Sequence, residues 1–342
     1  MRDGLALIGD ELPGETDETA RDGLTNSVSP ASLLPADCAA RLALHAAVAD
    51  GTYVGIVRFD EPLARHTTLK IGGPADVYLA PANAEAMAWA LGWARAAHLP
   101  VTVIGGGSNL LVRDGGVRGV VVTTKGMRTI TRVGPALLGV ESGVSTGKVL
   151  ATATEYELGG VEFLGGVPGT VGGGLIMNAG TYVGEFKSVA VRVDSVRIAD
   201  GVRVQRDNAM CGFGYRHSAL PADEIVVYAE LALHARPRAE IVADVKALRQ
   251  RRHEREPLKV SSNGSTFKNP PGQFAGRLIE AAGCKGWHEG DAVCSPVHAN
   301  WLVNTGHATA TQLLALIDRV RVEVLRVHGV ALELEVKIIG DN

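Results

Sequence analysis

Hydrophobic and polar positions follow two different spacings along this chain. In roughly the first two thirds, short apolar runs typical of buried strands alternate with segments whose apolar side chains recur at helical spacing. The predicted strands are 54–57, 101–104, 119–122, 136–141, 193–198, 202–205 and 224–233. The predicted helices are 36–49, 83–98 and 146–157, the last with Gly159 and Gly160 as its C-terminal stop.

The pattern changes after Pro237, where helices are predicted at 238–255, 272–282 and 309–328. Residues 332–338 then alternate with period two, which predicts a half-buried strand with Glu333 and Glu335 on one polar face. We therefore expect an α+β protein of three parts. These are a disordered acidic extension (1–35), an α/β cofactor-binding region (36–236, core about 68–236) and a smaller C-terminal α/β substrate domain (237–342).

Two glycine-rich loops are the most informative local feature. Residues 165–174 contain six glycines, and Gly105-Gly106-Gly107 follows a predicted strand. Taken alone, such runs also occur in tight turns and linkers. Glycine at this density nevertheless lets the backbone approach a ligand closely and leaves N–H groups free for phosphate oxygens. The two loops together predict a nucleotide cofactor that is held largely by the backbone.

Neither loop matches the two common phosphate-binding fingerprints. Gly105-Gly106-Gly107 lacks the G-x-G-x-x-G spacing of a Rossmann site. The segment 143–148 is one residue short of a P-loop, and Val149 stands where a Ser or Thr would hold magnesium. We interpret this segment as a turn that enters a helix, and the glycine loops as part of another nucleotide-binding scheme.

Composition excludes several classes of partner. A net charge of −3 argues against a nucleic-acid binder, and 46% hydrophobic residues suffice for a sizeable core. No apolar run approaches the ~20 residues that span a bilayer. The chain shows no signal peptide, so we expect a cytoplasmic protein without an obligate protein partner. The four cysteines form no C-x-x-C pair, and we expect no metal site.

Three further segments contain more polar and charged side chains than the packing of a core requires. They are Phe213–Ser218 with Arg216, Asn263–Pro270 with Ser265, and the terminal strand with its two glutamates. Each has a plain structural alternative, because Arg216 could form a surface ion pair, Ser265 could sit in a turn, and the glutamates could face solvent. The order of all these segments along the chain, however, matches a known pattern.

From about residue 58 to 340 the chain resembles the UDP-N-acetylenolpyruvoylglucosamine reductase (MurB) family. The matching segments are 67–75, 104–112, 160–180, 213–218, 264–270, 275–279, 298–300 and 335–340. The resemblance implies an FAD-binding domain of the PCMH or vanillyl-alcohol-oxidase type, with non-covalent FAD, and a smaller substrate domain. It also implies NADPH-dependent reduction of UDP-N-acetylglucosamine enolpyruvate to UDP-N-acetylmuramate, a step in peptidoglycan synthesis.

The same resemblance implies a role for individual residues. Arg216 would stabilise developing negative charge, Ser265 would donate a proton and Glu335 would assist near the substrate carboxylate. Only the match of Val336 and Ile339-Gly340 selects Glu335 over Glu333. The implied cofactor-binding residues are Gly72, Gly73, Gly105, Gly106, Gly107, Ser108, Asn109, Gly169, Thr170, Gly172, Gly173 and Asn178. The implied substrate-binding residues are Tyr215, Arg255, Asn269 and His298.

Two alternatives to this reductase stay open at the level of sequence. A related FAD-dependent sugar or lactone oxidase would often bind flavin covalently through a histidine near the first glycine loop, and none occurs between His98 and His217. A non-catalytic flavin or UDP-sugar sensor would have lost residues such as Arg216, Ser265 and Glu335. The short spacing between Arg216 and Ser265 also places the chain in the branch without an additional tyrosine-bearing loop.

Overall fold

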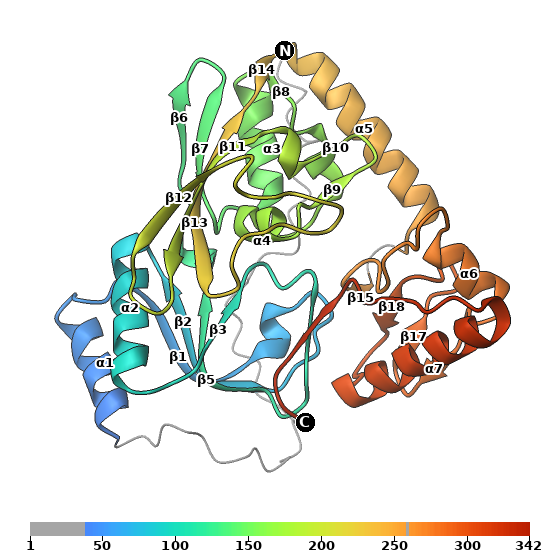
Figure 1. Cartoon of the computed structure of the whole chain (residues 1–342), viewed down its shortest axis with the longest axis horizontal. Coiled ribbons are helices and arrows are strands. Elements are labelled where there is room, and N and C mark those ends of the chain that lie inside the picture. Colours follow the sequence, from blue (N-terminus) through green and yellow to red (C-terminus); the bar gives the residue numbers. More distant parts are fainter. Residues whose placement is uncertain (1–37, 258–259) are drawn as a thin grey trace, which may run out of the picture.

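The computed structural model describes residues 38–257 and 260–342. The predicted disordered extension, 1–35, lies outside these residues. Figure 1 shows two lobes, which we call the first lobe (38–236) and the C-terminal lobe (260–342), connected by the long helix α5 (Arg238–Arg255). Among the described residues, no helix is long and apolar enough to cross a membrane.

A four-stranded sheet in the order β1-β2-β5-β3 forms one half of the first lobe. Strand β2 (Pro74–Pro81) is buried almost throughout, with Val77 and Leu79 in a core that includes Met87. Helix α2 begins after Asn83, whose side chain accepts a hydrogen bond from the Ala86 N–H. The other elements of this half are α1 (Ala39–Ala49), β1 (Gly55–Pro62), η1 (Leu63–His66), α2 (Ala84–Ala96), β3 (Val101–Ile104), β4 (Leu110–Val112), β5 (Val117–Thr123) and η2 (Thr124–Gly126).

A five-stranded antiparallel sheet in the order β12-β11-β13-β7-β6 forms the other half. Its inner face packs against α3 and α4 around Phe163 and Phe186, whose rings meet edge to face at 5.7 Å. Its elements are β6 (Ile130–Gly134), β7 (Leu137–Glu141), α3 (Thr146–Glu155), β8 (Leu158–Gly159), η3 (Glu162–Gly166), α4 (Val171–Ile176), β9 (Gly180–Thr181), β10 (Gly184–Glu185), η4 (Phe186–Ser188), β11 (Ala190–Arg197), β12 (Arg203–Asp207), β13 (Glu224–Ala232) and β14 (His234–Ala235).

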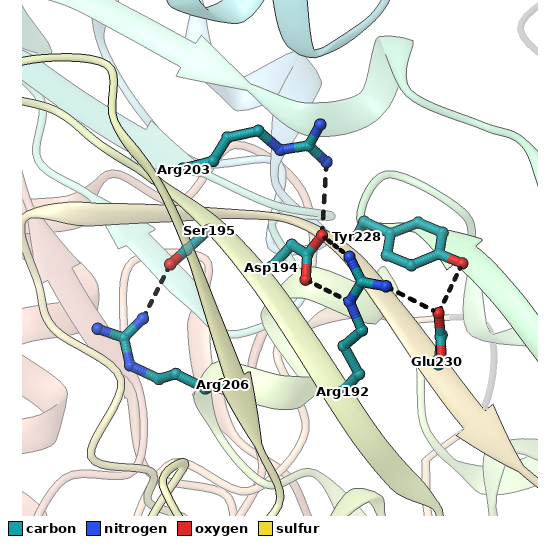
Figure 2. Close-up of polar contacts among 7 residues, drawn as sticks. All are labelled: Arg192, Asp194, Ser195, Arg203, Arg206, Tyr228 and Glu230. Atoms are coloured by element: carbon teal, nitrogen blue, oxygen red, sulfur yellow. Dashed lines mark hydrogen bonds and ion pairs between the residues drawn. The ribbon is translucent and has the colours of Figure 1, made fainter.

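Polar side chains on both faces of β11 fix its position between its neighbours (Figure 2). On one face, the buried Asp194 accepts two hydrogen bonds from Arg192 at 2.8 Å and pairs with Arg203 at 3.5 Å. On the other face, Arg206 of β12 donates to Ser195 at 3.0 Å. Arg206 also pairs across β11 with Glu224 at 2.6 Å. Since a one-residue slip would exchange these two faces, the charges specify the register of the sheet.

The C-terminal lobe packs two helices against a small sheet in the order β15-β18-β17-β16. Its core also includes Leu69, Ile71 and Leu111 from the first lobe, so one hydrophobic cluster continues across the lobe boundary. The elements of this lobe are β15 (Ser261–Ser262), α6 (Ala275–Ala281), β16 (His288–Glu289), β17 (Ala292–Cys294), β18 (Leu302–Asn304), α7 (Ala310–His328) and β19 (Lys337–Ile339).

The C-terminal end of the chain returns to the first lobe (Figure 1). There β19 pairs in parallel with β4. Asp114, in the loop after β4, accepts hydrogen bonds from the N–H groups of Ala310 and Thr311 at the start of α7. Asn304 donates to the Leu69 carbonyl oxygen at 3.0 Å. These contacts and the shared core hold the two lobes in a defined arrangement.

Most of the predicted elements are present, and the differences have local causes. The helix predicted at 146–157 ends at Glu155, because Glu157 adopts a left-handed conformation (φ 55°) and Leu158–Gly159 pairs with His234–Ala235. The strand predicted at 332–338 is wrong in its first half. Only Lys337–Ile339 is a regular strand, and Leu334 forms an isolated bridge to Phe267.

Candidate active site

A cavity of about 1800 Å³ lies between the two lobes. Both glycine loops line one side of it, and residues 260–265, His298 and the β19 segment line the other. The end of α5, with Arg251, Arg252 and Arg255, lies along the same space. Since pockets for one small ligand typically measure about 300–1,000 Å³, this cavity has room for a cofactor together with a substrate.

The two glycine loops contact one another at the cavity wall. A Cβ atom on Gly106 would lie 2.8 Å from the Gly169 Cα, which leaves no space for any side chain there. Within the described part of the chain, the N–H groups of Gly106, Gly107 and Ser108 form no hydrogen bonds. Unpaired N–H groups on a closely packed glycine loop are a suitable site for a phosphate group.

Two threonine hydroxyls beside these loops also lack partners. The Oγ1 atoms of Thr68 and Thr170 are buried, and neither has a hydrogen-bond partner among the described residues. Both threonines line the cavity. Because buried polar atoms are nearly always paired, these hydroxyls and the free N–H groups fit a polar ligand such as the pyrophosphate and ribose of FAD.

Arg216 reaches the cavity from a tight turn. Gly214 and His217 form an antiparallel bridge, and Arg216 between them has a left-handed backbone (φ 52°) that is unusual for a residue with a side chain. Asn178 donates to the Gly214 carbonyl oxygen at 2.9 Å, and Ser218 donates to that of Ile176 at 2.9 Å. The second glycine segment thus supports the turn that positions Arg216.

Arg216 and Glu335 form an ion pair across the lobe boundary. The Arg216 Nε atom lies 2.9 Å from a Glu335 carboxylate oxygen, and the Glu335 side chain is only 15% exposed. Burial raises the pKa of the Glu335 carboxyl above its ordinary value, although Arg216 and Lys268 oppose that rise. Glu333, in contrast, is 77% exposed and pairs with Lys268 outside the cavity.

Ser265 lies in the loop after β15 and lines the same cavity. The preceding Gly264 has a left-handed backbone (φ 76°), and Thr266 is held by a hydrogen bond from its N–H to the Asn300 carbonyl oxygen at 2.8 Å. Among the described residues, none forms a hydrogen bond with the Ser265 hydroxyl. The hydroxyl is therefore available to a bound ligand.

Two of the predicted substrate-binding residues, Arg255 and His298, line the cavity. Burial lowers the pKa of the His298 ring, which favours its neutral form. Its Nδ1 atom accepts a hydrogen bond from the Asn300 N–H at 3.2 Å. Nε2 is therefore the ring atom left for a ligand. Of the predicted cofactor-binding residues, those that line the cavity are Gly105, Gly106, Gly107, Ser108, Asn109, Gly169, Thr170, Gly172 and Gly173.

Five predicted site residues lie elsewhere. Gly72 packs against Val112 at the end of β4, and a Cβ on Gly73 would lie 2.1 Å from the Asp114 carbonyl oxygen in the loop that follows. Asn178 is fully buried beneath the Arg216 turn. Tyr215 is 56% exposed, and Asn269 accepts a hydrogen bond from the Ala275 N–H at the start of α6. None of the five lines the cavity.

The structure adds residues that we did not predict. Thr68 contributes one of the unpaired hydroxyls, and Lys337 lines the cavity two residues after Glu335. Tyr182 lies at the cavity with its ring 4.9 Å from the Arg251 guanidinium carbon. The spacing of Lys337 from Glu335 was a usable signal in the sequence. Thr68 lies in the matching segment 67–75, which was also a usable signal. Tyr182 carries no local signal, because only the fold brings it to the cavity.

Comparison with known proteins is consistent with this geometry. Residues 256–339 match the family model "UDP-N-acetylenolpyruvoylglucosamine reductase, C-terminal domain", and residues 75–205 match the model "FAD binding domain". The chain is 44% identical over 283 residues to the UDP-N-acetylenolpyruvoylglucosamine reductase of Moorella thermoacetica, covering 83% of this chain and 93% of that protein.

Two further similarities extend the comparison. UDP-N-acetylenolpyruvoylglucosamine reductase 2 of Symbiobacterium thermophilum is 44% identical over 291 residues, which cover 84% of this chain and 94% of that protein. The crystal structure of UDP-N-acetylenolpyruvylglucosamine reductase (MurB) from Thermus caldophilus matches with a TM-score of 0.72 at 36% identity, covering 83% of this chain and 98% of the other.

Proposed function

This chain belongs to the UDP-N-acetylenolpyruvoylglucosamine reductase family, and from that premise we propose that Arg216, Ser265 and Glu335 carry out its chemistry in the inter-lobe cavity. The activity is the FAD-dependent reduction of UDP-N-acetylenolpyruvoylglucosamine to UDP-N-acetylmuramate, with NADPH as the source of electrons. The named relatives are reductases, which favours this activity over that of an oxidase.

The reaction adds a hydride and a proton across the carbon–carbon double bond of the enolpyruvyl group. FAD held at the two glycine loops would supply the hydride for the terminal carbon, and NADPH would provide the electrons for it by oxidation to NADP⁺. The electron pair of the double bond then resides on the carbon next to the substrate carboxylate. The protein must stabilise this negative charge and deliver one proton to that carbon.

The residues in the cavity match these two requirements. Arg216 provides a fixed positive charge, and its ion pair with the buried Glu335 at 2.9 Å orients the guanidinium group. The unpaired hydroxyl of Ser265 is the proton donor. A serine is a weak acid in water, but a carbanion is a strong base, and the nearby positive charge of Arg216 stabilises the alkoxide that remains. Solvent then returns a proton to Ser265.

The observation that carries this proposal is the convergence of three distant sequence segments on one cavity that also contains both glycine loops. For the substrate nucleotide we propose Arg255 and His298 as contacts, because both line the cavity near the α5 arginines. Because the product is a precursor of peptidoglycan, we further propose that the protein acts in the cytoplasm and supports cell-wall growth and division.

Stopped-flow absorbance of the flavin tests the proposed function. We expect NADPH to bleach the bound flavin, and anaerobic addition of UDP-N-acetylglucosamine enolpyruvate to restore its colour rapidly. A matched trial with UDP-N-acetylglucosamine, which lacks the enolpyruvyl group, should leave the flavin bleached. A flavin that responds only to oxygen would instead support an oxidase.

A further inference from the structure

Asn109 connects the first glycine loop to the chain segment that carries Glu335. Its side-chain Nδ2 donates a hydrogen bond to the Glu335 carbonyl oxygen at 3.0 Å. Its own carbonyl oxygen accepts from the Lys337 N–H at 3.0 Å. Asn109 therefore binds the backbone on both sides of Val336. The family resemblance had implied instead that Asn109 contacts the cofactor.

The backbone of Glu335 is held from two directions. Its N–H donates to the carbonyl oxygen of Thr266, the residue after Ser265, at 2.9 Å. Its C=O accepts from Asn109, and the regular pairing of β19 with β4 begins only at Lys337. The Asn109 amide is thus the contact through which the first lobe fixes the Glu335 peptide. The isolated bridge between Phe267 and Leu334 secures the other side.

This contact bears directly on the geometry of the site. Glu335 reaches Arg216 with a single 2.9 Å contact, and Arg216 belongs to the first lobe. If the Glu335 peptide rotated, the carboxylate would move away from Arg216. We propose that Asn109 is a positioning residue that fixes Glu335 against Arg216 and thereby couples the catalytic carboxylate to the proposed cofactor loop. This inference rests on the proposed function.

Asn109→Ala tests the coupling in the full-length protein. We expect reoxidation of the flavin by substrate to slow on the order of 10- to 100-fold, as is typical when a catalytic group is misplaced by a fraction of an ångström to an ångström. Flavin content, FAD affinity measured by flavin fluorescence, and the rate of reduction by NADPH should stay close to those of the natural protein. Asn109→Asp keeps the size but removes the donor, and should show the same selective loss.

Asn304 provides a matched control. Its Nδ2 makes the same kind of hydrogen bond between the lobes, to the Leu69 carbonyl oxygen at 3.0 Å, but contacts neither Glu335 nor Arg216. We expect Asn304→Ala to lower Tm without a selective effect on reoxidation. If Asn109→Ala instead lowers FAD affinity and both half-reactions to the same extent, Asn109 is a cofactor contact and the proposal is overturned.

A double-mutant cycle with Glu335→Gln separates this inference from the proposed function. If Asn109 acts through Glu335, adding Asn109→Ala to Glu335→Gln should cause little further slowing, because coupled residues are not additive. If the double variant instead slows reoxidation by the product of the two single effects, the coupling is refuted. If Glu335→Gln alone reoxidises at the natural rate, the catalytic role of Glu335 fails and the positioning role fails with it. If only Glu335→Gln is slow, the positioning role alone is refuted.

Discussion

The two walls of the inter-lobe cavity differ in the groups that they present to a bound ligand. The wall of the first lobe contains both glycine loops, where Gly106 packs against Gly169 and where the N–H groups of Gly106 and Gly107 have no partner among the residues that the structure describes. The opposite wall presents side chains with reactive groups, Ser265 and Glu335, on segments anchored by Thr266 and Lys337. Arg216 crosses from the first wall to pair with the second.

We infer from this difference that the two walls have different roles. A wall of main chain can hold a large cofactor tightly but offers few groups for proton transfer. A wall of side chains supplies acids and charges, and its residues can be replaced without blocking the cavity. Changes in the side-chain wall should therefore affect a single chemical step, whereas changes in the glycine wall should affect cofactor binding and so every step that depends on it.

Ser265→Ala should produce the largest effect and tests the side-chain wall. Without the hydroxyl no proton donor remains beside the carbanion, so we expect reoxidation by substrate to fall by ~10²–10⁴-fold, the usual contribution of a general acid. Reduction by NADPH should be nearly unchanged. Stopped-flow measurement of both half-reactions decides this. Equal loss in both would assign Ser265 a structural role.

Gly106→Ala tests the glycine wall, with a smaller expected effect. Its new Cβ would lie 2.8 Å from the Gly169 Cα, so the loops must separate, at about 1–3 kcal/mol for such overpacking. We expect weaker FAD binding and a lower ratio of flavin to protein absorbance, with both half-reactions reduced in proportion.

The control for this variant is Gly147→Ala in α3, where nothing lies within 4 Å of the added methyl group. There the higher helix propensity of alanine should leave FAD binding intact and stabilise the fold by up to about 1 kcal/mol. Unchanged FAD binding in Gly106→Ala would show that the contact between the loops is not required for the cofactor.

The smallest effect concerns pH. Because burial raises the pKa of Glu335 above the ordinary 4.5, its ionisation removes stability as the pH rises through the folded-state pKa. Glutamine cannot ionise, so the Tm of Glu335→Gln minus that of the natural protein should increase with pH over this range. Calorimetry at a series of pH values measures it. A difference that decreases with pH would mean that the ion pair with Arg216 outweighs burial.

The sequence predicted the elements with strong local signals. The helices predicted at 238–255 and 309–328 were close to their observed bounds, and the second of them ends at Gly329, which adopts the left-handed C-cap (φ 67°). The strands predicted at 193–198 and 202–205 are also present, as β11 and β12, which pair antiparallel on either side of Asp200-Gly201. Strand β2 was missed because it is buried at nearly every residue and so shows no alternation. The small sheet of β15–β18 was missed because its strands have only two or three residues each.

The choice between Glu333 and Glu335 shows the limit of what a local sequence pattern can predict. Alternation placed both on one face, but residues 333–336 do not form a regular strand, so one side chain is 77% exposed and the other 15%. Family resemblance favoured Glu335, and the structure places Glu335 against Arg216. Asn269 and Asn178 fit the family pattern in the sequence, yet both make structural hydrogen bonds away from the cavity.

The sequence alone determined the glycine loops, the principal helices and the family, because these depend on residue type, periodicity and the order of motifs. The tertiary structure alone decided which side chains share the cavity. Arg216 and Glu335 are 119 residues apart, and Asn109 and Glu335 are 226 apart. Contacts at such separations arise only when Leu69 and Leu111 of the first lobe pack into the hydrophobic core of the C-terminal lobe. No local sequence pattern specifies that packing.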